Sequence, residues 1–294
     1  MSMVELLLQQ AVNGLSIGVI YSLIAIGLTL ILGILGVINC AQGEFYMLGA
    51  FMAFTAQRAL GFGYWASILV ALVTVAILGI LFEYLSLKPL RGRHEFTLLL
   101  STIGGSIFLQ NTAQIIWGPD PQSIDSPFAH KPILLGGDIN ITQQRLLIFV
   151  LGLVLIGFIA LFIKRTKLGM AMRATAKDIG TASLMGVNVG FIFAFTFAFG
   201  TALAAAAGSL LGPVLDIGVT MGEWAVIKAF CVVIMGGMGN VPGAILGGLT
   251  LGLAENIGIV FFPTGYQDAV GYTILILVLL FRPRGLFSTG KGLA

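Results

Sequence analysis

KRTKLGMAMRATAKDIGTASLMGVNVG, residues 164–190, is a long polar stretch set between two apolar runs, 146–163 and 191–212. Lys and Arg resist translocation, so a short basic loop between two membrane spans is expected on the cytoplasmic side. Its Ala, Leu and Met residues predict a short helix that stops at Gly186, before Val187 and Asn188. The alternative is an ordinary solvated loop. The stretch carries one acid, Asp178, and five basic residues: Lys164, Arg165, Lys167, Arg173 and Lys177.

The composition is that of a membrane protein. Hydrophobic residues make up 58% of the 294 residues and charged residues only 9%, whereas soluble domains carry about 25% charged residues. We therefore expect an all-α polytopic membrane protein, with residues 1–294 forming a single transmembrane domain. The net charge of +3 arises from short loops between spans, so it reports topology and gives no support to a nucleic-acid partner.

Apolar segments of the chain predict roughly eight to nine transmembrane helices, at about 20 residues each. Segments 45–59 and 226–235 are short for a full crossing, and we expect them to be glycine-broken or re-entrant. Basic residues place 88–95, 164–190 and the tail 282–294 inside. The side of the N-terminus stays open because no Lys or Arg precedes Arg58. The segments are 12–38, 45–59, 65–87, 96–117, 146–163, 191–212, 226–235, 245–262 and 269–281.

Two polar or glycine-dense breaks, NCAQGE at 39–44 and GGMGNVPGA at 236–244, lie in opposite halves of the chain. Broken hydrophobic segments in corresponding halves indicate a transport pathway, because irregular backbone survives at membrane depth only beside protein or water. The alternative is a pair of ordinary tight turns. The candidate pathway residues are Asn39, Gln42, Gly43, Glu44, Lys228, Gly236, Gly237, Gly239, Asn240 and Glu255.

Ionisable residues at membrane depth are costly and usually face a protein interior or water. Lys228 is expected to pair with Glu44 or Glu255, and structural pairing is favoured over direct contact with substrate. Glu83 lies close to Lys88 in sequence, which places it at the cytoplasmic interface.

Motifs that carry enzyme chemistry are missing from the sequence. It has no GxxxxGK[ST] phosphate loop, no His/Cys metal spacing and no G-x-S-x-G or HExxH motif. We therefore expect no catalytic, cofactor-binding or metal site on this chain.

Six ordered blocks resemble permease subunits of bacterial ABC importers for branched-chain amino acids, over essentially the whole chain. They are NGLSIGVIYSLIAIGLTLILGILGVINCAQGEFYMLGA, LKPLRGR, STIGGSIFLQN, TKLGMAMRATAKDIGTASLMGVNV, MGGMGNVPGAILGG and RPRGLF. The subgroup is similar to LivH-like permeases and not to their longer LivM-like partners. One departure is Gln42, where the family usually has His, so an amide replaces a titratable imidazole at this position.

The resemblance implies that the basic stretch is a cytoplasmic coupling helix, seated in a groove of a separate ATPase. The matching residues are Gly169, Arg173, Ala174, Ala176, Asp178, Ala182, Met185 and Gly186. Arg173 and Asp178 are expected to fix its register by charge-assisted hydrogen bonds.

The resemblance also implies the partners: a sister permease, with a LivM-like heterodimer favoured over a homodimer, two P-loop ATPases that bind ATP and Mg, a periplasmic or lipid-anchored solute-binding protein, and the lipid of the bacterial inner membrane. Branched-chain or related hydrophobic amino acids are the expected substrates. Urea or short amides are the alternative within the family, and an ATP-independent secondary transporter or channel is the alternative outside it.

Overall fold

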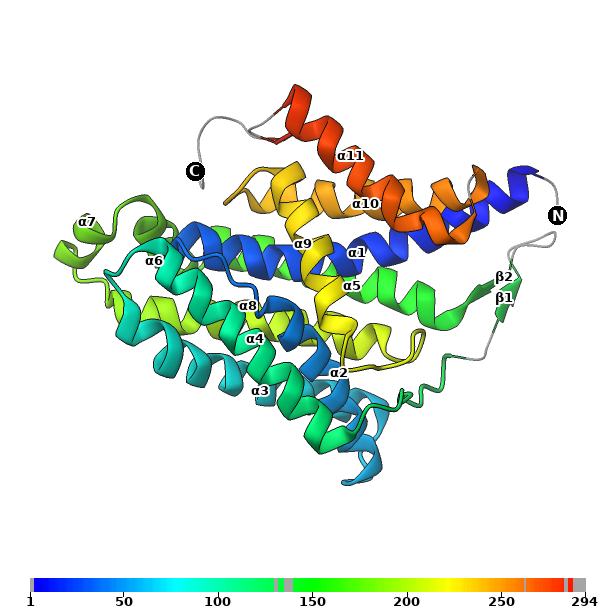
Figure 1. Ribbon diagram of the computed structural model, residues 1–294, viewed down its shortest axis with the longest axis horizontal. Helices are drawn as coiled ribbons and strands as arrows, with labels where there is room; N and C mark the ends of the chain where they lie inside the picture. Colours follow the sequence, from blue (N-terminus) through cyan, green and yellow to red (C-terminus); the bar gives the residue numbers. More distant parts are fainter. Residues whose placement is uncertain (1–2, 130–131, 135–139, 262, 283–284, 288–294) are drawn as a thin grey trace.

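The computed structural model describes residues 3–129, 132–134, 140–261, 263–282 and 285–287. Helices dominate these residues, and the longest of them run mostly along one long axis (Figure 1). A small antiparallel hairpin of β1 (Pro132–Leu134) and β2 (Asn140–Thr142) lies at the end where the chain starts. The helices of the bundle are α1 (Met3–Leu35), α2 (Gln42–Arg58), α3 (Tyr64–Phe82), α4 (Glu95–Trp117), α5 (Gln143–Arg165), α8 (Val189–Leu211), α9 (Met221–Gly236), α10 (Val241–Phe261) and α11 (Gln267–Phe281).

These nine helices of the described chain correspond one to one with the nine apolar segments expected, so the all-α polytopic fold is confirmed. Five are long and apolar enough to cross a membrane: α1, α3 with its extension to Leu90, α5, α8 and α10. The other four are short or polar. Helices α2, α9 and α11 have 17, 16 and 15 residues, and α4 has 23 residues with several amides among them.

The two ends of the bundle differ in charge as the positive-inside rule requires. The turn after α3 and the helices α6 (Lys167–Lys177) and α7 (Ile179–Leu184) lie at one end, and the N-terminus lies at the other (Figure 1). With the basic end in the cytoplasm, α1 starts on the outer side. The loop charges alone did not determine this side for the N-terminus. We call these ends inner and outer below.

At the inner end, α3 continues through a π-helical turn, Glu83–Leu87, and a 3-10 turn, Lys88–Leu90. The Glu83 carboxylate, almost fully buried, is paired there with the Arg91 guanidinium. Glu83 thus lies next to the basic turn, and its position at the membrane interface stays a prediction.

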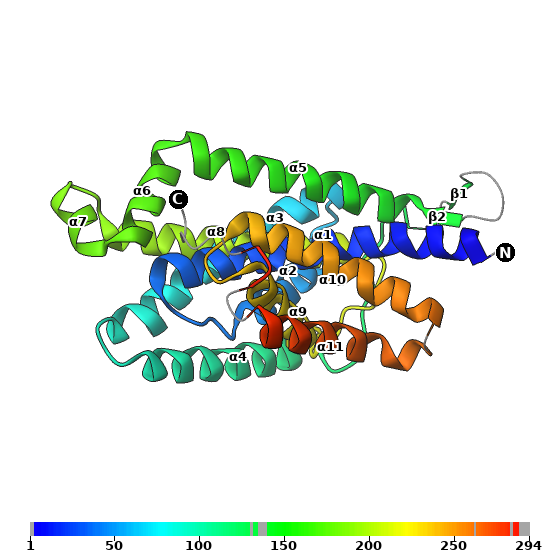
Figure 2. The same ribbon diagram turned by 90° about the horizontal axis from the view of Figure 1, so that it is seen from above.

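Helix α1 forms the centre of the bundle, with α5 on one side and α4 and α11 on the other (Figure 2). It packs most closely on α10, where glycines of the two helices face each other. A methyl group on Gly14 would lie 2.7 Å from the Gly252 carbonyl oxygen, and one on Gly18 would lie 2.9 Å from that of Gly248. Small residues permit this approach of two membrane helices, which hydrophobicity alone does not drive.

Candidate functional site

The basic stretch that follows α5 folds into two short helices, α6 and α7, and not into one. Thr166 starts α6 by accepting a hydrogen bond from the Gly169 amide at 3.0 Å. Asp178 ends α6 and starts α7, because its carboxylate accepts hydrogen bonds from the amide and the hydroxyl of Thr181 at 3.1 and 2.8 Å. The Thr181 backbone amide, followed by its hydroxyl, holds the pKa of Asp178 below its usual value. Asp178 is therefore a helix cap.

The C-terminal side of α7 ends as predicted, at Gly186, whose φ of 83° is the left-handed conformation that favours glycine. Asn188 does not belong to this stop. Its side chain caps α8 by accepting from the Phe191 amide at 3.1 Å.

The eight predicted coupling residues divide between the interior and the surface. Gly169 and Ala182 are buried, and Arg173 and Ala176 are half-buried. Arg173 is therefore less exposed than Asp178. The exposed members are Ala174, Asp178, Met185 and Gly186.

Sequence reasoning missed the most exposed apolar residue of this region. Leu184 is 90% exposed and its neighbour Met185 is 81% exposed, at the C-terminal end of α7, a helix that projects from the inner end of the bundle (Figure 1). Ile179 and Met170 are also about half exposed. We call Met170, Ile179, Leu184 and Met185 the inner apolar tip. The Leu–Met pair inside a polar stretch could have indicated this site from the sequence, because exposed apolar clusters mark interaction sites.

The first predicted break, residues 39–44, is buried and held by hydrogen bonds. The Asn39 amide donates to the Gln42 side-chain oxygen at 3.2 Å, and the Gln42 amide donates to the Gly200 carbonyl of α8 at 3.0 Å. Glu44, with a relative exposure of 1%, accepts from the Ser106 hydroxyl of α4 at 3.0 Å. Gly43 lies against the backbone of Gly222, where α2 meets α9.

The second predicted break is a tight turn between α9 and α10. Gly237 and Gly239 have φ angles of 94° and 77°. The Asn240 side chain accepts from the Gly243 amide at 3.2 Å and donates to the Phe287 carbonyl at 2.8 Å, so the C-terminal segment covers this turn. Gly236 lies against Gly243, in the same turn.

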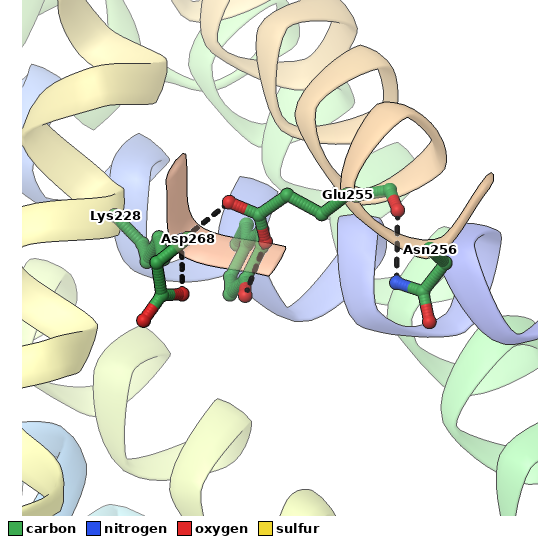
Figure 3. A network of polar contacts seen from close by, with 6 residues as sticks. Lys228, Glu255, Asn256 and Asp268 are labelled. Atoms are coloured by element: carbon green, nitrogen blue, oxygen red, sulfur yellow. Dashed lines mark hydrogen bonds and ion pairs between the residues drawn. The ribbon is translucent and has the colours of Figure 1, made fainter. Parts of the chain in front are cut away.

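The predicted pairing of Lys228 with a membrane acid is confirmed, and the acid is Glu255 (Figure 3). Glu255 also accepts from the Tyr21 hydroxyl of α1 at 3.0 Å. The Lys228 ammonium also lies 2.8 Å from a second carboxylate, that of Asp268 in the first turn of α11. Asp268 falls just outside the apolar segment 269–281 that was expected from the sequence. Glu44 lies apart from this cluster, beside Ser106.

A cavity of about 360 Å³ adjoins this ion cluster on the outer side of the bundle. We call it the outer cavity. Of the ten candidate pathway residues, it is lined by Lys228 alone. The outer cavity is lined by residues outside the two breaks, which include Ile20, Ile24, Tyr46, Leu211, Leu215, Asp216, Ala225, Lys228 and Asp268.

Comparisons with known proteins agree with this architecture. The family model "Branched-chain amino acid transport system / permease component" matches residues 10–279. The chain is 41% identical to the high-affinity branched-chain amino acid transport system permease protein BraD of Pseudomonas aeruginosa, over 96% of this chain and 95% of that protein. It is 37% identical to the corresponding permease protein LivH of Escherichia coli, over the same shares of the two chains. To the permease protein LivM of Escherichia coli it is 26% identical, over 91% of this chain and 67% of that protein.

The match to the family model covers most of the described chain, including both breaks and α6–α7. It therefore assigns the multi-pass fold to a transport subunit and not to an enzyme. The chain belongs to the family of branched-chain amino acid transport system permease components.

Proposed function

We propose that this chain is the permease subunit of an ABC importer of the bacterial inner membrane, carrying branched-chain or related hydrophobic amino acids. Family membership supports the transport role, and the names of BraD and LivH support the substrate class. The single structural observation that carries the proposal is the inner apolar tip, which exposes Leu184 and Met185 at the end of α7.

The inner apolar tip is suited to dock into a groove of a separate ATPase subunit. Its side chains supply apolar area at a site where the backbone is fixed by the caps Thr166 and Asp178. Gly169 lies buried against the Ile163 backbone, so α6 is packed directly on the end of α5. Movement of a docked tip would therefore be passed to α5, and through α5 to α1.

The transport cycle proposed is alternating access between two permease subunits, with ATP and Mg bound on the partner ATPases. A LivM-like sister chain is favoured as the second permease, because this chain matches the shorter LivH over nearly its full length and LivM over 67%. A solute-binding protein would deliver substrate to the outer loops.

Co-purification from native membranes tests the assembly. We expect the solubilised chain to bring with it a sister permease, two P-loop ATPases and ATPase activity that rises when a leucine-loaded binding protein is added. Urea-loaded binding protein is expected to have no such effect, and stimulation by urea alone would assign the chain to the urea or short-amide branch.

A charge placed on the inner apolar tip tests the docking role of α7. Leu184→Glu is expected to abolish the stimulated ATPase activity, because a carboxylate would be buried in an apolar groove. The matched control is Leu60→Glu, since Leu60 is a 60% exposed leucine at the outer end of α2. Stimulation that is equal in Leu184→Glu and wild type would contradict the assignment of α7.

An ATP-independent secondary transporter is the alternative of a different class, and the buried ions of α9 and α10 are the observation that favours it. Flux through vesicles that contain only this chain, without ATP, would establish that alternative.

A further inference from the structure

The outer cavity has the features of a small-ligand site. Its volume of about 360 Å³ lies in the range of such sites, about 300–1,000 Å³. It is bounded by the outer ends of α8, α9 and α11, so it faces the side from which an importer receives substrate. One wall is aliphatic, with Ile20, Ile24 and Leu211, all nearly fully buried.

Other lining residues of the outer cavity carry charges of both signs. Lys228 is 4% exposed and contacts two carboxylates, Glu255 and Asp268 (Figure 3). Glu255 is fully buried and is also held by the Tyr21 hydroxyl, so it is a fixed partner. The Asp268 side chain is 43% exposed and stands in the first turn of α11, so it is the partner that can leave Lys228.

We propose that the outer cavity binds the zwitterionic head of an α-amino acid between Lys228 and Asp268, with the amino acid's side chain on the aliphatic wall. The α-carboxylate takes the place of Asp268 on the Lys228 ammonium, and the released Asp268 carboxylate accepts the α-ammonium. This inference rests on the proposed transport function and names the recognition site within the membrane.

The charges already present select for a zwitterion. Lys228 faces Asp268 and Glu255, and Asp216 also lines the cavity, so negative charge is in excess. A carboxylate without an ammonium would add to that excess. A neutral amide such as urea would separate Lys228 from Asp268 without giving either residue a new charged partner, which is costly for the buried Lys228 ammonium. A zwitterion exchanges one ion pair for two.

Leucine binding to the complete transporter, nucleotide-free in lipid nanodiscs and without binding protein, tests the site. 4-Methylpentanoate, which is leucine without its ammonium, is the matched ligand. Asp268→Asn is expected to weaken leucine binding by about tenfold or more, the effect of losing one hydrogen bond between charged groups. Binding of 4-methylpentanoate should be unchanged or tighter, because Asp268 no longer competes for Lys228. The preference for leucine over 4-methylpentanoate should therefore collapse.

Two further variants locate the effect. Asp120→Asn removes an exposed acid of the outer loop, outside the cavity lining, and should leave both ligands unaffected. Ala225→Leu fills the outer cavity from α9 and should weaken leucine binding more than alanine binding, without changing the charges.

ATP-driven leucine uptake by the wild-type complex, with its binding protein, separates this inference from the proposed function. If uptake is present but Asp268→Asn and Ala225→Leu bind leucine as wild type does, the site is overturned and the function stands. The site is also overturned, and the function stands, if the wild-type complex transports leucine but binds none in the nucleotide-free state. Absence of leucine uptake by the wild-type complex would instead overturn the proposed function itself.

Discussion

Replacing Gly252 by alanine tests the contact on which the centre of the bundle depends. A methyl group at Gly252 of α10 would lie 2.5 Å from three backbone atoms of α1: the Gly14 oxygen and the nitrogen and Cα of Gly18. These atoms belong to a continuous helix and cannot rotate away as a side chain does. Helix α10 therefore has to move away from α1.

The cost follows from that movement. Reaching an ordinary contact of 3.4 Å requires a shift of about 0.9 Å, the difference from 2.5 Å. Overpacking costs about 1–3 kcal/mol, and alanine returns about 1 kcal/mol of helix propensity. Because the clash is with three backbone atoms, we expect an overpacking cost near the upper end of its range. The net loss of stability is then about 2 kcal/mol. The shift also displaces Glu255, less than one turn further along α10, from Tyr21 on α1.

Thermal unfolding of the purified protein in detergent, followed by size-exclusion fluorescence, measures this loss. Gly252→Ala should melt about 5 °C below wild type, on the scale of roughly 2–4 °C per kcal/mol for chains of this size class. The control is Gly104→Ala in α4, where a methyl group meets open space within the described chain and should be neutral or slightly stabilising. Equal melting temperatures for Gly252→Ala and Gly104→Ala would refute the helix contact.

Three further predictions concern polar groups. Lys228→Met should cost about 3–5 kcal/mol because Glu255 stays buried without its cation, and adding Glu255→Leu should recover most of it in thermal melts; no recovery would argue against the ion pair. Gln42→Leu should cost about 1–3 kcal/mol, because the buried Asn39 side-chain amide loses its acceptor, and a neutral result in the same melts would contradict that bond. The pKa of Asp178 is lowered in the folded protein. The stabilisation that its cap provides is therefore fully present above the unfolded-state pKa of about 3.9, and it is lost as the pH falls through the lower folded-state pKa. Hydrogen exchange at the Thr181 amide, corrected for intrinsic rate, should be constant from about pH 5 to 8 and faster below about pH 4; loss of protection already near pH 6 would exclude this cap.

The sequence was sufficient to predict the class of fold and the inner end of the bundle. Apolar segments placed all nine bundle helices, and five of these helices have the length and apolar composition that crossing a bilayer requires. Periodicity could not show that Asp178 divides the basic stretch into α6 and α7. That division depends on whether its carboxylate turns back to Thr181 or outward to a partner, which is a local geometric choice.

The candidate site was predicted in part. Lys228 and Glu255 stood out as ions in apolar sequence, and their pairing follows from the cost of burying either alone. Asp268 was missed because a polar residue at the start of a helix cannot be distinguished by sequence from a loop residue. The aliphatic wall of the outer cavity was missed because an isoleucine that lines a cavity has the same sequence pattern as one in the packed core. The outer cavity arises where α1, α8, α9 and α11 meet, and that meeting depends on tertiary packing.

The most direct test of the transport role is leucine uptake into proteoliposomes, with and without ATP on the inner face. We predict that uptake requires the complete complex, the binding protein and ATP, and that vesicles holding only this chain take up none. Uptake by this chain alone, unchanged when ATP is omitted, would contradict the importer and assign the chain to the secondary transporters.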